Sequence, residues 1–221
     1  MKQVLAIAVL MASALASSAQ WDSLDYTPRD TTRLLYDGGF DFREGVYFGF
    51  EDFRQNRPSV ALKDLLNEQG KPAGDLRQSN GKLFYVDSTG TKQRINLDRT
   101  WGFCNRDVVY VRIGDGFSRI GMMGSIAHIV FDNTYSNWGG YYGGMYGMEP
   151  TTTTVQEQRL LDMATGNFLP VNSGGVYQAI QGDTDLRAEF EALPKKERNN
   201  DLSVFRFIRR YNERHPLYFP K

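Results

Sequence analysis

The sequence predicts an α+β fold, in which an antiparallel meander sheet carries helices from the C-terminal part of the chain packed on it. Short alternating apolar runs separated by turn residues occupy the middle of the chain. Later segments repeat their apolar residues with a helical period and begin at capping residues. The predicted strands are apolar on both faces, so both faces need cover, and the sheet could be curled or barrel-like.

The first nineteen residues have the pattern of a signal peptide. Lys2 is the only charged residue before Gln20, an apolar run over 4–15 follows it, and small residues come next. The run is too short to span a bilayer. We expect export to the periplasm, the outer membrane or the extracellular space, with cleavage before Gln20 favoured over cleavage before Ser17. An uncleaved anchor or a buried strand is the alternative.

Charge and length limit the classes of protein and partner. The 221 residues include 26 basic and 26 acidic side chains, which gives a formal net charge of zero. This balance predicts no attraction to nucleic acid or acidic lipid. No later stretch reaches the ~18 apolar residues of a membrane-spanning helix, so no integral span is expected after signal removal. We expect a polar tail at 20–37 and a single domain at 38–221.

The first elements of the domain are short. Residues 44–49 are predicted to form a strand, and 50–53 a helical turn with both Phe side chains on one face. Pro58 ends the turn. Residues 59–70 fit either a short helix capped by Ser59 or an extended run, and 69–81 has the composition of a loop.

The central sheet is predicted to contain four consecutive strands, over 82–87, 93–98, 107–113 and 117–131. Turn residues at 88–91 and 114–116 separate two of the pairs. Residues 101–105 are expected to be a loop between the second and third strands. Within the last strand, Ala127, Ile129 and Phe131 share one face.

A Gly/Tyr-rich segment at about 133–154 is predicted to be a loop insertion, because glycine at this density cannot hold a stable strand interior. Exposed aromatic groups of this kind are costly on a soluble surface and favour interfaces. They could stack on sugars, pack on a partner or meet lipid, and a low-complexity insert without function is the alternative. The candidate interaction surface consists of Trp138, Tyr141, Tyr142, Met145 and Tyr146.

The C-terminal part is predicted to be a hairpin followed by helices. Strands over 155–164 and 168–171 are joined by a turn at 165–167. One helix starts at Asn172 or Ser173, a second is capped by Asp183, and a third starts at 199–201. In the third helix the apolar stripe consists of Val204, Phe207, Ile208 and Tyr211.

Several phrases occur in order along the chain. They are Gly45-Val46-Tyr47 with Phe50-Glu51-Asp52-Phe53 and Asn56-x-Pro58-Ser59; Trp101-Gly102-Phe103-Cys104 before Val109-Tyr110-Val111; Leu161-Asp162-Met163-x-Thr165-Gly166; and Tyr211-Asn212-Glu213-Arg214-His215-Pro216. The set covers most of the chain after Phe40 and resembles a family of exported proteins of unknown function from Bacteroidetes bacteria. The resemblance implies export across the inner membrane and a mixed sheet-and-helix fold. It implies no activity.

The residue types needed for catalysis or metal binding are sparse. Cys104 is the only cysteine, so no internal disulfide can form, and we expect it to be buried and structural. Thiol catalysis would need it near His128 or His215. There is no Cys pair and no His pair at helical spacing, so no metal and no cofactor are expected. The acidic group of Asp183, Asp185 and Glu189 lacks the glycine of a calcium loop and fits helix capping better.

The leading hypothesis is a non-enzymatic exported domain that binds an envelope protein or a glycan, or supports the envelope structurally. The competing hypothesis is a hydrolase of envelope polymers that uses carboxylates such as Glu51 and Asp52, or Cys104. Adjacent carboxylates on a helical turn point apart, which weakens it. A deep acid-lined pocket would favour the enzyme, and a flat surface would favour the binding domain.

Overall fold

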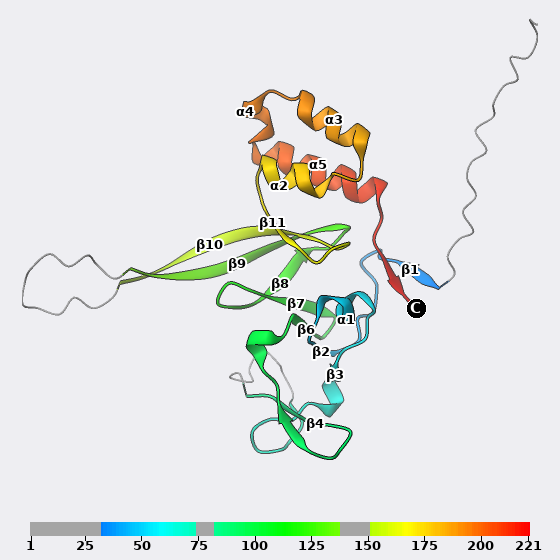
Figure 1. The fold of residues 1–221 in the computed structure, drawn as a ribbon, viewed down its shortest axis with the longest axis vertical. Coiled ribbons are helices and arrows are strands. Elements are labelled where there is room, and N and C mark those ends of the chain that lie inside the picture. The colour runs from blue at the N-terminus through cyan, green and yellow to red at the C-terminus, as the bar shows by residue number, and fades with distance from the viewer. Residues whose placement is uncertain (1–31, 74–81, 138–150) are drawn as a thin grey trace, which may run out of the picture. The chain divides into compact units, whose positions relative to one another are not determined.

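The structure is a computed structural model that describes residues 32–73, 82–137 and 151–221 (Figure 1). The predicted signal peptide and the five residues of the predicted interaction surface lie outside these ranges. The strands are β1 (Arg33–Leu35), β2 (Gly45–Tyr47), β3 (Val60–Ala61), β4 (Phe84–Val86), β5 (Lys92–Arg94), β6 (Gly102–Asn105), β7 (Val108–Ile113), β8 (Gly116–Met122), β9 (Ile126–Asn137), β10 (Thr151–Asp162), β11 (Phe168–Pro170) and β12 (Tyr218–Pro220). The helices are α1 (Phe50–Arg54), α2 (Ser173–Ala179), α3 (Thr184–Ala192), α4 (Lys195–Arg198) and α5 (Asp201–Arg214), with 3₁₀ turns η1 (Leu62–Asp64) and η3 (Leu97–Arg99).

An antiparallel sheet of eight strands dominates the fold, in the order β11-β10-β9-β8-β7-β6-β2-β3. Four of the five helices follow it in the chain, so the predicted α+β class with C-terminal helices is confirmed. In the described residues β11 and β3 are the two ends of this order, so the sheet is not a closed barrel. Residues 116–119 of β8 pair with β7. Ile120 and Met122, further along the same strand, pair with β9, and the register shifts between them. Such an irregularity bends a strand, which curls the sheet at β8.

Two predictions for the middle of this sheet are wrong. Residues 117–131 form two antiparallel strands, β8 and β9, because the chain reverses at 123–125. Gly124 lies at this reversal, and a Cβ there would lie 2.4 Å from the Asn212 side-chain nitrogen, so a larger residue would displace the Asn212 side chain. The predicted loop at 101–105 contains β6, which is buried along its whole length and pairs with both β2 and β7.

The first two predicted strands form a separate sheet. β4 pairs only with β5 among the described strands, and the chain then turns into η3, where the Asn96 side chain accepts a hydrogen bond from the Asp98 N–H. The small sheet covers one end of the large one, because Leu83 and Ile95 pack with Phe103. The helix alternative for 59–70 is also wrong, since this run begins with β3 paired to β2 and continues as η1.

Strands occupy more of the chain than the sequence predicts, both near its two ends and beside the predicted Gly/Tyr-rich loop. β1 lies within the predicted polar tail at 20–37 and pairs with β12, which was not expected (Figure 1). The predicted loop at 133–154 is wrong at its edges, because β9 continues to Asn137 and β10 starts at Thr151. Threonines favour extended backbone, and each residue of this part has a cross-strand partner.

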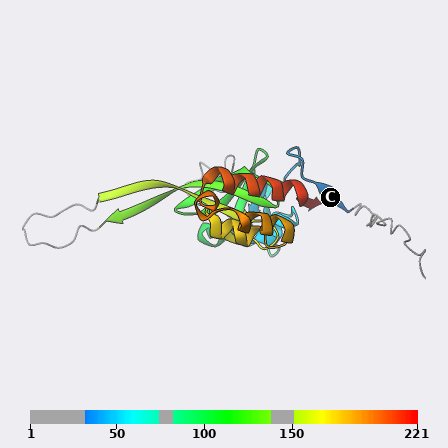
Figure 2. The same ribbon diagram turned by 90° about the horizontal axis from the view of Figure 1, so that it is seen from above.

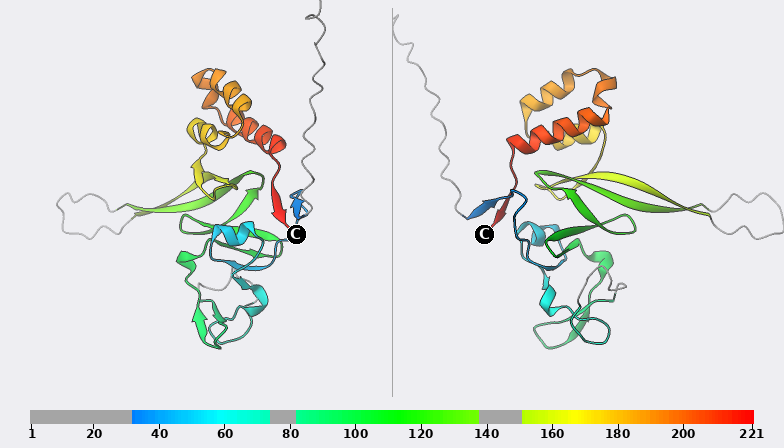
Figure 3. Two further views of the ribbon diagram at one scale, coloured as in Figure 1. Left: turned by 45° about the vertical axis from the view of Figure 1, so that its right-hand side comes forward. Right: turned by 180° about the vertical axis from the view of Figure 1, so that it is seen from behind.

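The two faces of the sheet are covered by different groups. One face carries Tyr47, Cys104, Val111 and Ile129, which pack with α1 and the C-terminal Phe219. On the other face α2, α3 and α5 cover the β9–β11 end, as Figures 1 and 3 show. Three buried clusters result, one for each covering layer and one under the small sheet.

The predicted C-terminal helices are confirmed, together with their caps. Side-chain oxygens of Asn172, Asp183 and Asn200 accept hydrogen bonds from backbone N–H groups in the first turns of α2, α3 and α5. Such caps satisfy donors that have no partner inside the helix. The short α4 was not predicted. The hairpin of β10 and β11 is also confirmed, and its turn contains Gly166 at a φ of +78°.

Candidate interaction surface

The longest strands in the described part of the chain extend beyond the rest of the sheet. β9 and β10 are each twelve residues long and pair over their full length. Within the described residues, β8 pairs with β9 at His128 and Ile129 only, and β11 pairs with β10 at 159–161 only. The outer parts, 130–137 and 151–158, therefore form a two-stranded arm, which Figures 1 and 2 show projecting from the sheet. A two-stranded ribbon is marginally stable alone, so its packing at the root matters.

The β7–β8 turn holds the root of the arm. The Thr134 backbone N–H donates to Asp115 Oδ2 at 2.7 Å, so a carboxylate takes the place of a strand carbonyl. Gly114 in the same turn has a φ of +59°, and a Cβ there would lie 2.7 Å from the Phe131 ring. The turn thus lies directly against the arm, and only glycine fits at the contact.

A polar network runs along one face of the arm. The Tyr135 hydroxyl donates to the Glu157 carboxylate, and Asn133 Nδ2 donates to both, at 2.9 and 3.0 Å. Arg159 pairs with the same carboxylate at 3.1 Å, and its guanidinium lies over the Phe131 ring. The hydrogen bond from Tyr135, followed by that from Asn133, holds the pKa of Glu157 below its ordinary value. These contacts link side chains of β9 to side chains of β10 along the arm.

The opposite face of the arm presents hydroxyl and amide groups. Thr134 and Thr154 lie opposite each other, with their hydroxyl oxygens 3.2 Å apart. Ser136, Thr152 and Gln156 are exposed on the same face. Exposed apolar groups lie on the face of the polar network, where Tyr135 is 50% exposed and Val155 43%. A mixed surface of this kind is typical of interfaces with proteins or sugars.

The carboxylates predicted as hydrolase candidates have structural partners. Asp52 Oδ2 accepts hydrogen bonds from the Gly49 N–H at 3.1 Å and from the Ser59 hydroxyl at 2.7 Å. Glu51 accepts from the Gln55 side chain on the next turn. These contacts stabilise the start of α1 and the turn after Pro58, and they explain both acids without catalysis.

The predicted burial of Cys104 is confirmed. The residue is fully buried in β6, and its Sγ lies 3.9 Å from the Phe42 carbonyl oxygen. Burial, followed by the nearby Glu44 and Asp107 carboxylates, raises the pKa of the thiol to about 12. A nucleophilic cysteine needs the opposite shift, because the thiolate is the reactive species.

Both histidines serve contacts between elements. The His128 Nε2 atom lies 2.8 Å from Gln158 Oε1, and the ring meets Phe205 edge-on. His215 contacts Asp183 Oδ2 at 3.1 Å. Each histidine therefore has a polar partner on a neighbouring element.

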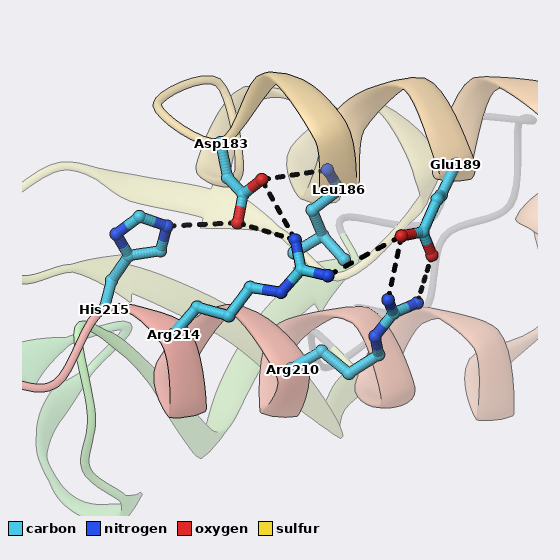
Figure 4. A network of polar contacts seen from close by, with 6 residues as sticks. All are labelled: Asp183, Leu186, Glu189, Arg210, Arg214 and His215. Atoms are coloured by element: carbon cyan, nitrogen blue, oxygen red, sulfur yellow. Dashed lines mark hydrogen bonds and ion pairs between the residues drawn. The ribbon is translucent and has the colours of Figure 1, made fainter. Parts of the chain in front are cut away.

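The acidic residues at the start of α3 hold two helices together (Figure 4). Asp183 accepts hydrogen bonds from the Leu186 N–H at 2.9 Å and from Arg214 at 3.2 Å, beside the contact with His215. The Leu186 N–H is the largest cause that lowers the pKa of Asp183 to about 2, and His215 and Arg214 add to it. Glu189 pairs with Arg210 of α5. In the described part of the chain, acids, histidines and the cysteine form no group able to hold a metal ion.

Two of the hollows on the described surface are open and polar. The larger, about 540 Å³, lies between 94–98 and the pair Arg112 and Asp115, and the Arg112–Asp98 ion pair at 2.6 Å is part of its lining. The smaller, about 280 Å³, lies beside Gln156, Gln158 and the 170–172 segment. Both are open to solvent, and the two acids that line the larger one have partners, because Asp98 pairs with Arg112 and Asp115 accepts from the Thr134 N–H.

Comparisons with protein-family models, with curated proteins and with solved structures found no match for this chain. The resemblance to exported Bacteroidetes proteins therefore stays a prediction from the phrases that carry it. Among the described residues, no helix has the length and apolar character needed to cross a membrane.

The arm was only partly foreseen from the sequence. The sequence predicted a loop over the whole of 133–154, and the five residues of the predicted interaction surface lie outside the described ranges. The threonines at 151–154 are β-branched and favour a strand, and this signal could have revealed the second half of the arm. The open edges and the Asp115 contact depend on pairing between distant residues, which leaves no trace in local sequence.

Proposed function

We propose that this chain is an exported, non-enzymatic binding domain of the cell envelope or the extracellular space, and that the arm carries its binding surface. The observation that carries the proposal is the arm itself. Twelve-residue strands extend beyond the sheet, are linked by cross-strand polar contacts and offer exposed Tyr135 and Val155. A fold gains little stability from such an extension, which supports a role in binding.

The partner that this surface suits is an envelope protein or a glycan. Aromatic and hydroxyl groups together can stack on sugar rings and hydrogen-bond to their hydroxyls, and they also suit protein contacts. The predicted residues Trp138, Tyr141, Tyr142, Met145 and Tyr146 belong to the segment that joins the two arm strands. The hydrolase alternative has less support, since Asp52 and Glu51 have structural partners and Cys104 is buried.

Shortening the arm should separate binding from folding. We would replace residues 136–152 with Asn-Gly, which joins the paired residues Tyr135 and Thr153 by a two-residue turn and keeps the contact of Thr134 with Asp115. The free energy of unfolding should change by about 1 kcal/mol or less, because loop-closure entropy varies slowly with length. Capture of an envelope protein or glycan by the immobilised domain should be lost, because the variant lacks Ser136, Thr152 and the five candidate residues between the arm strands. Mass spectrometry and glycan profiling of the bound fraction measure this loss.

A matched control for this variant is Leu202→Ala, which changes an exposed apolar residue on α5, 80% accessible and outside the arm. It should fold and capture the same partner as the native chain. Full capture by the shortened variant would contradict the proposal. A much lower unfolding temperature of the shortened variant would show instead that the segment belongs to the core.

Export is tested by the mass of the mature chain. Expressed with its own N-terminus in a bacterium that exports proteins, the chain should be recovered outside the cytoplasm with Gln20 as its first residue. A start at Ser17 would correct only the cleavage site. A chain retained in the cytoplasm with Met1 would contradict the localisation, whatever the result of the capture experiment.

A further inference from the structure

The outer edge of β10 exposes backbone groups that no strand of the described chain pairs with. The Thr134 N–H donates away from β10, to Asp115, so the Thr134–Thr154 pair is of the type that exchanges no backbone hydrogen bonds. Pairs alternate along an antiparallel ladder, so the N–H and C=O groups of Thr152, Thr154 and Gln156 point away from β9. Pro170 of β11 fits the same alternation. It pairs with Arg159, whose backbone groups point toward β9, so this pair exchanges no backbone hydrogen bonds and the missing N–H of proline is not needed.

This edge lacks the features that normally prevent strands from pairing between molecules. Open edges are usually protected by lysine, proline or a bulge. The stretch 152–158 contains none of these residues and pairs with β9 in an unbroken register. Its only charge, Glu157, already has Arg159 as an ion-pair partner. β-Branched residues at 152–155 further favour the extended backbone that pairing needs.

We propose that β10 pairs antiparallel with β10 of a second copy of this chain, with Thr154 of both copies facing each other at the two-fold axis. In this register Thr152 of one copy faces Gln156 of the other, and about six backbone hydrogen bonds form. The pairing is self-complementary, as a two-fold interface requires. The two Glu157 carboxylates would lie about 20 Å apart along the ribbon, beyond the range of strong repulsion in physiological salt. This inference goes beyond the proposed function, because it concerns the edge of the arm and a second copy.

The surroundings of the two arm edges favour β10 over β9. On the β9 side, the Asp115 carboxylate already takes the Thr134 N–H, and the β7–β8 turn covers the root. On the β10 side, the smaller hollow lies beside Gln156 and Gln158, where β11 has turned away toward α2. A partner strand along β10 can therefore extend to the root of the arm, which the β9 edge does not permit.

Sedimentation equilibrium of the purified mature chain, from low to high micromolar concentration, provides the test. The native chain should sediment as a dimer. Thr154→Lys and Thr154→Glu should each be monomeric, because like charges would face each other at the axis, and an equimolar mixture of the two should regain the dimer mass. Ser136→Lys adds the same charge to the same face on β9, and it should remain dimeric.

Two further variants test the register and the edge. Thr154→Pro removes an N–H that β9 does not use, so the chain should fold, as judged by circular dichroism, and lose the dimer mass. Thr154→Cys should form an intermolecular disulfide under mild oxidation, whereas Ser136→Cys should not, and the native Cys104 is buried and will not interfere. A monomeric native chain, or a dimer that survives Thr154→Lys and Thr154→Pro, would overturn the proposal. Envelope capture by the monomeric Thr154→Lys variant would show that the partner surface functions separately from this edge.

Discussion

Replacing Phe53 with alanine is expected to lower the free energy of unfolding by about 3–5 kcal/mol, the range for a large aromatic residue removed from a core. Phe53 is fully buried on α1, and its ring lies 4.5 Å from the Trp101 ring and 5.5 Å from that of Phe42, between centroids. It also meets Phe219 of β12 edge-on. One side chain thus joins α1, the large sheet and the C-terminal strand, and the surrounding rings cannot collapse fully into the space it would leave.

Urea unfolding followed by circular dichroism measures this effect. Leu202→Ala also removes an apolar side chain from a helix, but from an exposed position, and it should change the free energy by about 0.5 kcal/mol or less. A loss below about 1 kcal/mol for Phe53→Ala would mean that the aromatic cluster is not tightly packed. The position of β12 over this cluster would then need revision.

Replacing Asn56 with alanine is expected to cost about 2–4 kcal/mol, from lost hydrogen bonds and from backbone strain. The Asn56 carboxamide accepts from the Arg43 N–H at 2.8 Å and donates to the Asp41 carbonyl at 3.2 Å. The Tyr47 hydroxyl lies 3.4 Å from the same oxygen. Asn56 has a φ of +46°, a left-handed conformation that asparagine tolerates better than alanine does.

Comparison with Asn56→Gly divides this effect into its two causes. Glycine removes the same hydrogen bonds but adopts the left-handed backbone without strain, so its loss should be smaller by about 1 kcal/mol. Thermal and urea unfolding of both variants provide the measurement. Equal losses would exclude backbone strain as a cause, and losses below about 0.5 kcal/mol for both would show that the buried carboxamide contributes little.

The phrases that resemble exported Bacteroidetes proteins lie at structural positions of this kind. Asn56 joins the segment before β2 to the end of α1. The Asn212 side chain bonds both the N–H and the C=O of Ile126, at 2.7 and 2.9 Å, and so fixes α5 to the start of β9. His215 contacts the cap of α3. These phrases therefore specify a fold, and the proposed binding surface lies outside them, on the arm.

Local interactions explain what the sequence by itself determined. The caps Asn172 and Asp183, the turn containing Gly166 and the apolar stripe of α5 act over a few neighbouring residues, so their pattern predicts the C-terminal half well. The alternating residues around Ile129 predicted a strand for the same reason, and its residues Ala127, Ile129 and Phe131 are buried as one face. The α+β class follows from the order of these segments.

The tertiary structure alone decided which strands pair and where each one ends. β6 looked like a loop because Gly102 and Asn105 disfavour strands locally, yet pairing on both sides makes it part of the sheet. β1 and β12 are three residues long, and each exists only because the other end of the chain supplies its partner. The arm likewise depends on cross-strand pairs and on Asp115 at its root. Strand pairing is non-local, so its free energy depends on residues that a local pattern does not contain.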